Sequence, residues 1–171
     1  IAPLCGISAR DEIMGDNEGF ASGSTFAGMP AGCAAAIRTL QIFERDRIVE
    51  QASRLGDIAA EIMNKWESSS IVRQSRGNGL LLGVSFCKPE GTNADEKDWW
   101  TARAVRSKML EQGVWAISDH EDTIRMYPAL NMAESTLREG LQVMEEAIAY
   151  VEKHGHDEGD APAYPAGVSG F

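Results

Sequence analysis

Hydrophobic residues in the first half of the chain repeat at the spacing of an α-helix. Between residues 33 and 66, apolar side chains recur every three or four positions on either side of a polar interruption. This pattern predicts two amphipathic helices. Pro30 suits the first turn of such a helix, and the polar run 44–47 predicts a bend or break between the two.

A second helical stripe lies near the C-terminus. Its apolar positions are Leu137, Leu141, Met144, Ile148 and Val151. Asn131 can cap this helix, and Glu134 follows three residues later, an arrangement close to a capping box. We therefore expect the last helix to begin near Asn131 and to bury this stripe.

Between these helices the pattern is that of short strands with one more helix. Segments with apolar or alternating character predict strands at residues 1–9, 71–73, 79–86, 114–117 and 123–127. The segment 79–86, GLLLGVSF, is apolar on both faces, so we expect this strand to be buried. Residues 97–112 suit a helix that Gly113 ends. The order of elements from residue 71 predicts a small α+β domain whose mixed or antiparallel sheet is covered by helices.

Composition narrows the class of protein. The chain has 171 residues, 43% of them hydrophobic, and a formal net charge of −10. Strong negative charge argues against nucleic acid or an anionic membrane as a partner, and no apolar run approaches the roughly 18 residues of a membrane helix. The cysteines at 5, 33 and 87 form no pair typical of zinc sites or disulfide frameworks, so we expect a reducing, cytoplasmic location.

Four segments, in this order, resemble class III aminotransferases of fold type I, which use pyridoxal 5'-phosphate. They are IAPLCGISARDEIM (1–14), GSTFAGMPAGCAAAIRTL (23–40), VRQSRGNGLLLGVSF (72–86) and the long C-terminal segment 111–148. The resemblance implies an α/β protein that is the C-terminal part of the pyridoxal-phosphate transferase fold. It implies the end of the large domain at 1–32, interdomain helices at 33–67, the small domain at 68–153 and a tail at 154–171.

The resemblance also implies what the chain does not contain. Family members hold the cofactor as a Schiff base on a lysine that would fall before Ile1, so we expect no catalytic residue within this sequence. The five lysines match nothing catalytic in the family. The chain opens at Ile1 inside an apolar stretch, and we expect that it continues upstream into the N-terminal half of the same enzyme.

Thr25 and its neighbour Ser24 are the candidate cofactor ligands. A phosphate ester needs several converging hydrogen-bond donors, and hydroxyl groups with backbone N–H groups on a Gly/Ser loop supply them. The resemblance implies that Thr25 reaches the cofactor phosphate of the neighbouring subunit, which requires a homodimer with the active site at the interface. A turn followed by a helix cap is the alternative role for this loop.

Arg125 is the candidate substrate ligand. A planar guanidinium can hold a carboxylate with two parallel hydrogen bonds, and Arg125 stands in an otherwise apolar strand, where burying it alone would be costly. The resemblance implies that it binds the α-carboxylate of the amino donor or keto-acid acceptor. A structural ion pair with one of the many carboxylates is the alternative.

Two other motifs predict structure rather than chemistry. The glycines that follow Arg76, at 77, 79 and 83, have the wrong spacing for a dinucleotide loop and precede a strand, so we interpret them as a turn and a closely packed strand. The acidic and histidine side chains of 154–160 alternate with glycine, and we expect no metal site there.

The resemblance implies a function: transfer of an amino group from an amino acid or amine to a keto acid. Racemases, epimerases and decarboxylases of the same fold use nearly the same residues and remain open. A non-catalytic half that only associates with a partner also remains open, because the Schiff-base lysine is not in this sequence.

Overall fold

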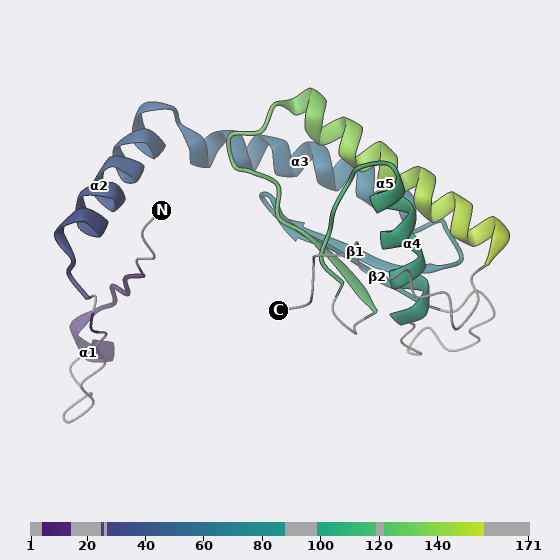
Figure 1. Cartoon of the computed structure of the whole chain (residues 1–171), viewed down its shortest axis with the longest axis horizontal. Helices are drawn as coiled ribbons and strands as arrows, with labels where there is room; N and C mark the ends of the chain where they lie inside the picture. Colours follow the sequence, from purple (N-terminus) through teal and green to yellow (C-terminus); the bar gives the residue numbers. More distant parts are fainter. Residues whose placement is uncertain (1–4, 15–24, 26, 88–98, 119–121, 156–171) are drawn as a thin grey trace. The chain divides into compact units, whose positions relative to one another are not determined.

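The computed structural model describes residues 5–14, 25, 27–87, 99–118 and 122–155. The chain divides into two compact units, residues 1–48 and 49–171, and Figure 1 shows the elements of each. In the described part of the chain, none of the helices combines the length and apolar character needed to cross a membrane.

The first unit is helical. A short helix α1 spans Asp11–Met14 and the longer α2 spans Pro30–Arg45. The strand expected at 1–9 is not present in its described part, since residues 5–10 belong to no helix or strand. The helix α2 begins at Pro30, as the sequence predicts, and it ends at Arg45 with Asp46 as its C-cap. The predicted break at 44–47 is therefore confirmed.

The second unit contains a three-stranded antiparallel sheet in the order β1-β2-β3. The strands span Val72–Asn78, Leu81–Phe86 and Thr123–Met126. A tight turn at Gly79, with a positive φ of 55°, joins β1 to β2, and only glycine adopts that backbone conformation without cost. The predicted turn and closely packed strand are thus confirmed.

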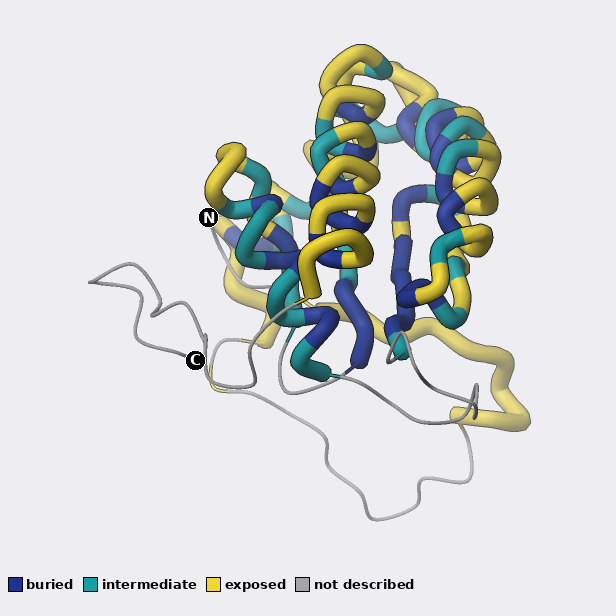
Figure 2. The backbone as a smooth tube through the Cα atoms, turned by 90° about the vertical axis from the view of Figure 1, so that its right-hand side faces the viewer, coloured by how far each residue is buried: buried dark blue, intermediate teal, exposed yellow. Residues whose placement is uncertain are grey.

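Three helices contribute to the core of this unit (Figure 1): α3 at Ile48–Trp66, α4 at Trp99–Glu111 and α5 at Glu134–His154. The core joins Leu55 of α3, Val105 of α4 and Met144 of α5 with Val84 and Ile124 of the sheet. Helices α3 and α5 are buried along one side and exposed along the other (Figure 2), as the helical spacing of apolar residues predicts, whereas α4 is buried or half-buried except at Glu111.

The last helix matches its predicted stripe, and α4 matches its predicted end. All five stripe positions of α5 are buried. Strand β2 is buried at every position except Leu81, which confirms the expectation of a strand covered on both faces. The helix α4 ends two residues before Gly113, where φ is 83°.

Three details differ from the sequence analysis. Strand β1 runs to Asn78 rather than ending at Arg73, because its polar residues pair with β2. The segment 114–117 is not a strand but makes one isolated bridge, between Ile117 and Arg125. The helix α5 starts at Glu134 with Ala133 as N-cap and no side-chain cap, so the predicted capping by Asn131 is wrong.

Candidate functional site

Thr25 lies in a turn just before the N-terminus of α2 and is exposed. Gly28, three residues on, has a φ of 71°, and no side chain caps the helix. The first N–H groups of a helix have no partner within it. Thr25 thus places a hydroxyl in the turn that leads to a helix N-terminus, where anions are stabilised. Ser24, the other predicted phosphate ligand, falls outside the described residues.

Arg125 lies in β3 and lines a pocket of about 300 Å³. The walls come from β2, the segment 114–117, the residues that follow β3 and the first half of α5. Among the described residues that line the pocket, Arg125 is the only one with a formal charge; the others include Leu82, Trp115 and Met132. Arg125 alternates along β3 with Met126, which pairs with Leu82, so the Arg125 side chain extends toward the opposite face of the sheet and Arg125 borders the pocket from the strand.

The backbone of Arg125 is fixed from both sides. Its N–H donates to Ile117 O at 2.8 Å, and its carbonyl accepts from the Ile117 N–H at 3.1 Å. On the other side, Arg125 pairs in register with Gly83 of β2. The arginine is therefore held within the sheet instead of on a free loop, which positions a binding side chain more accurately.

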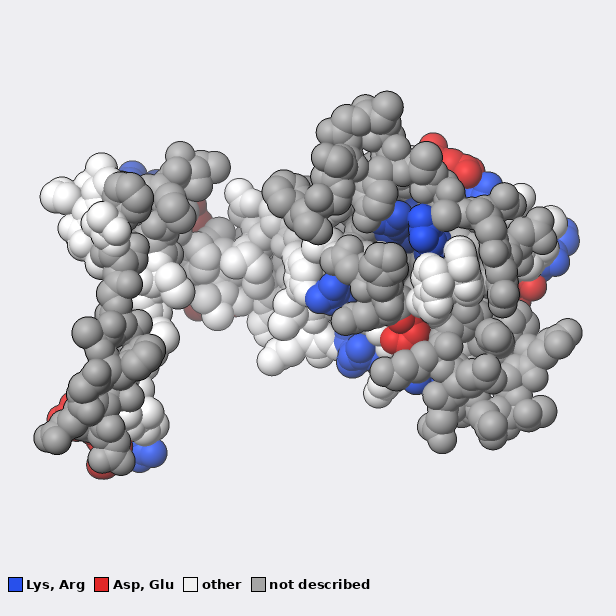
Figure 3. All heavy atoms as spheres, turned by 60° about the horizontal axis from the view of Figure 1, so that its bottom comes forward, with Lys and Arg blue, Asp and Glu red and all other residues white. Residues whose placement is uncertain are grey.

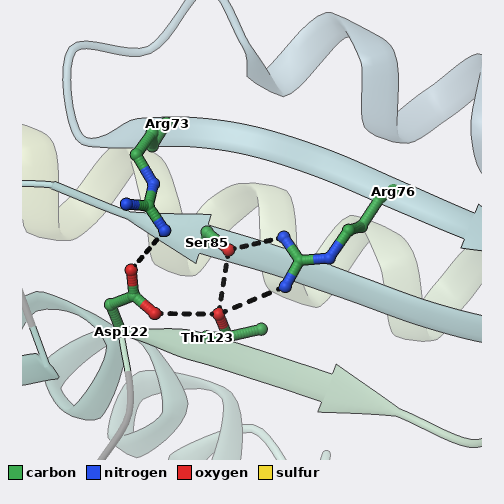
Figure 4. A network of polar contacts seen from close by, with 5 residues as sticks. All are labelled: Arg73, Arg76, Ser85, Asp122 and Thr123. Atoms are coloured by element: carbon green, nitrogen blue, oxygen red, sulfur yellow. Dashed lines mark hydrogen bonds and ion pairs between the residues drawn. The ribbon is translucent and has the colours of Figure 1, made fainter. Parts of the chain in front are cut away.

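A polar network covers the face of the sheet that points away from the core (Figure 4). The Arg73 guanidinium forms an ion pair with Asp122. Arg76 donates to Ser85 Oγ at 2.7 Å and to Thr123 Oγ1 at 3.5 Å. The two hydroxyl oxygens lie 2.8 Å apart, and Thr123 donates to Asp122 Oδ1 at 3.0 Å. We call these five residues the polar face.

The direction of the hydrogen bonds within the polar face follows from the number of protons. Thr123 has one hydroxyl hydrogen, which it donates to Asp122. Ser85 must then donate its own hydrogen to Thr123. Both hydroxyl oxygens keep lone pairs that accept hydrogen bonds from Arg76. The donors therefore follow in order from Arg76 through the two hydroxyl groups to the carboxylate of Asp122, which accepts the last hydrogen bond.

Four of these residues were not predicted from the sequence. Arg73, Ser85, Asp122 and Thr123 carry no motif, and Arg76 was considered only with its glycines. A signal was present in the strands: Ser85 and Thr123 alternate with apolar neighbours at a period of two, which marks one face of a sheet. The register that joins the three strands could not be read from that signal alone.

The described lysines lie on helices. Lys65, Lys108 and Lys153 belong to α3, α4 and α5, and Lys108 is bonded to Glu111 at 2.9 Å. In the described ranges, which leave out most of the tail, His, Cys, Asp and Glu side chains form no group that could hold a metal ion. The expectation for the tail beyond His154 falls outside these ranges.

Comparison with known proteins assigns the family. The family model for class-III aminotransferases matches residues 2–148. This chain belongs to the class-III aminotransferase family. The resemblance inferred from four short segments is therefore confirmed over most of the sequence.

Individual relatives match at moderate identity. Ornithine aminotransferase from Emericella nidulans is 29% identical over 147 residues, which are 86% of this chain and 31% of that protein. A leucine/methionine racemase from Thermococcus litoralis is 29% identical over 152 residues, covering 88% of this chain and 34% of that protein. The chain thus spans about a third of the length of these relatives.

Solved structures agree on the fold. Acetylornithine aminotransferase from Elizabethkingia anophelis matches with a TM-score of 0.66 and 27% identity, covering 83% of this chain and 33% of that one. A transaminase solved with L-alanine gives a TM-score of 0.70 at 21% identity, covering 83% of this chain and 34% of that one, which speaks for the fold alone. The expected fold class, part of an α/β transaminase fold, is confirmed.

Proposed function

We propose that this chain is part of a pyridoxal-phosphate-dependent aminotransferase that moves an amino group from an amino acid or amine to a keto acid. The observation that carries the proposal is the family match over residues 2–148. The geometry adds a hydroxyl before a helix N-terminus and an arginine that is held within the sheet. These are the two anion-binding features that a phosphorylated cofactor and a carboxylate substrate require.

The residues around Thr25 fit the phosphate of the cofactor. The helix α2 has 16 residues, so its N-terminus carries a substantial partial positive charge, and phosphate groups bind readily at such positions. Thr25 and Ser24 would donate hydroxyl hydrogen bonds to phosphate oxygens. The cofactor, when bound, supplies the conjugated ring that stabilises negative charge on the substrate carbon.

Arg125 would orient the substrate by its carboxylate. Its guanidinium can donate two parallel hydrogen bonds to a carboxylate, and its backbone is fixed by pairing with Ile117 and Gly83. Arg125 would therefore contribute mainly to substrate binding. The transfer of protons belongs to a lysine that we place in the part of the enzyme beyond this chain.

The assembly follows from the same proposal. We propose a homodimer in the cytoplasm, in which Thr25 of one subunit binds the phosphate of the cofactor held by the other subunit. The relatives are about three times as long as this chain, and we propose that further polypeptide supplies the remaining two thirds of the enzyme. The family relationship supports this arrangement. The amino donor and acceptor are small molecules.

Racemisation is a second candidate function. A relative named leucine/methionine racemase is as similar to this chain as the ornithine aminotransferase is, at 29% identity. An extended enzyme incubated with a single enantiomer and no keto acid separates the two functions. A racemase produces the opposite enantiomer under these conditions, whereas an aminotransferase accumulates a keto acid only up to the amount of cofactor present.

The proposed role of Arg125 is tested in an enzyme extended by its upstream residues. Arg125→Ala should raise KM for a carboxylate substrate by roughly ten- to a hundredfold, since a charged hydrogen bond contributes about 1.5–3 kcal/mol. KM for a simple amine should change much less. Steady-state kinetics with an amino acid and the matching amine measure both.

Arg125→Lys and Arg138→Ala serve as controls. Lysine keeps the charge but loses the planar pair of donors, so it should recover only part of the binding. Arg138 lies on α5 and bonds to Glu134 at 2.8 Å, so its loss should leave both KM values unchanged. Equal increases in KM for the amino acid and the amine would contradict the role of Arg125.

A further inference from the structure

Arg76 and Arg125 lie on the same face of the sheet. Arg76 pairs with Gly83 across β1 and β2, and Gly83 pairs with Arg125 across β2 and β3. Residues directly opposite one another in neighbouring strands direct their side chains to the same side. Gly83 has no side chain, so only its backbone separates the two arginines across the sheet.

The Arg76 side chain reaches across β2 toward β3. Its guanidinium bonds to Ser85 of β2 and to Thr123 of β3, and Figure 4 shows both contacts. Thr123 and Arg125 are two residues apart, so their side chains share a face at a spacing of about 7 Å along the strand. The Arg76 guanidinium is therefore held next to the position from which Arg125 extends.

The partners of Arg76 are neutral. Ser85 is fully buried and Thr123 is 6% exposed, whereas Arg76 itself is exposed. The nearby carboxylate of Asp122 is paired directly with Arg73 and reaches Arg76 only through the Thr123 hydroxyl. A guanidinium has five N–H donors, so two hydroxyl contacts leave donors that can still bind an anion.

Local charge contrasts with that of the whole chain. The polar face holds two guanidinium groups and one carboxylate, which leaves one positive charge in excess within these five residues. The complete sequence carries a net charge of −10. Figure 3 shows separate blue Lys and Arg side chains on the side of this unit that lies below in Figure 1, with red Asp and Glu side chains near some of them. A positive region on an acidic protein concentrates anions from solution.

We propose that Arg76, anchored by Ser85 and Thr123, forms a carboxylate-binding site together with Arg125. Arg76 would bind a carboxylate group other than the one assigned to Arg125, and it would thus determine which ligands with two carboxylates are accepted. This identification of the ligand as a substrate rests on the proposed function. The other possible source of the carboxylate that binds Arg76 is an acidic side chain from the part of the enzyme beyond this chain.

The site is tested by direct binding, with no cofactor and no turnover. The 171-residue chain, with ¹⁵N-labelled arginine, is titrated with glutarate while the Nε–H signals of Arg76 and Arg125 are followed by NMR. Both signals should shift and saturate together, and the uncharged analogue 1,5-pentanediol should shift neither. The titration involves neither transamination nor cofactor. If glutarate does not bind, the carboxylate-binding site is contradicted, and the proposed function is still tested separately by the steady-state kinetics of Arg125→Ala.

Variants identify the contribution of Arg76. Arg76→Gln should weaken glutarate binding at least tenfold, and Arg76→Lys should weaken it less because charge remains without the planar pair of donors. Arg138→Gln, which removes an arginine from α5, should leave the affinity within twofold. No saturable shift of the Arg76 signal, or an equal loss for Arg76→Gln and Arg138→Gln, overturns the proposal.

The same titration of the extended enzyme separates the two sources of the carboxylate. A response to glutarate like that of the 171-residue chain supports a small-molecule ligand. An Arg76 signal that is already shifted and no longer responds to glutarate supports an acidic side chain as the occupant of the same site. An unshifted signal that fails to respond overturns the proposal. The wild-type signals decide the result even if a variant fails to fold.

Discussion

Glu152 shows how one carboxylate joins two distant parts of the chain. Near the end of α5, it accepts hydrogen bonds from the Ser70 N–H at 2.6 Å and from the Ser70 hydroxyl at 2.8 Å. The backbone hydrogen bond and then the hydroxyl hydrogen bond from Ser70 lower the pKa of Glu152 below its ordinary value of 4.5. Glu67 has the same arrangement with Ser75, whose backbone and hydroxyl hydrogen bonds lower the pKa of that carboxyl.

The lowered pKa of Glu152 gives a dependence of stability on pH. The ionised carboxylate stabilises the fold above its ordinary pKa of 4.5, and this stabilisation is lost as pH falls through the lower folded pKa. Glu152→Gln should therefore reduce the free energy of unfolding at neutral pH by no more than about 1 kcal/mol, because both Ser70 and Glu152 are exposed and water screens the interaction. Urea unfolding at neutral and acidic pH measures the difference.

The matched control is Glu145→Gln, at an exposed position on the same helix. It should leave the urea midpoint nearly unchanged at both pH values. The Glu152→Gln variant should also lose less stability on acidification than the wild type does. A Glu152→Gln protein with an unchanged midpoint at neutral pH would contradict the role given to this carboxylate.

Among the elements, α3 is held against the β1–β2 turn by two glycines. A Cβ atom added at Gly56 would lie 2.5 Å from Gly79 Cα and 2.6 Å from Gly79 O. Both neighbours are backbone atoms, which cannot move without shifting the turn or the helix. The close approach of these elements therefore requires glycine at position 56.

Gly56→Ala should destabilise the second unit. Overpacking of this kind typically costs about 1–3 kcal/mol, more than the gain of up to about 1 kcal/mol in helix propensity that alanine brings. Gly140→Ala in α5 is the control, because nothing lies within 4 Å of its added Cβ, and it should be neutral or stabilising. Thermal unfolding of both variants followed by circular dichroism compares them, and a Gly56→Ala protein as stable as Gly140→Ala contradicts this packing.

Elements with a strong apolar period were predictable from the sequence, and those without one were not. The stripe of α5 and the buried strand β2 follow directly from their residues, since only one arrangement buries them. Strand β1 continues through the polar residues 74–78, whose pairing partner β2 supplies the hydrogen bonds. No local pattern in 74–78 could reveal that partner.

The start of α5 shows a local rule overridden by tertiary contacts. Glu134 was expected to complete a capping box with Asn131. Instead it accepts hydrogen bonds from Arg54 of α3 at 2.6 Å and from Arg138 at 2.8 Å. Hydrogen bonds from Arg54 and then Arg138 lower the pKa of Glu134. The contact with α3 lies 80 residues away in sequence, which sequence patterns cannot anticipate.

The candidate site could be predicted only in part, for a related reason. Arg125 was identifiable because a charged residue stands in an apolar strand, and its ligand-binding role stays a prediction. The polar face depends on the register of three strands and on the reach of the Arg76 side chain. The proposed roles of Thr25 and Ser24 stay predictions, and Ser24 lies outside the described residues.

At the scale of the whole molecule, the proposed enzyme has its anion-binding groups and its cofactor-attaching lysine in different parts of the polypeptide. The chain covers about a third of its relatives' length. In the proposed enzyme it supplies groups that bind anions, while the lysine that attaches the cofactor lies in the preceding polypeptide. The second unit joins α3 to the sheet, α4 and α5 in one core, which gives Arg125 and the polar face a rigid support.

Attachment of the cofactor tests this claim most directly. The 171-residue chain and a chain extended by its upstream residues are each incubated with pyridoxal phosphate, reduced with borohydride, digested and analysed by mass spectrometry. The account predicts stoichiometric labelling of one upstream lysine in the extended chain and no specific labelling of the 171-residue chain. Stoichiometric labelling of one of this chain's own five lysines would contradict it.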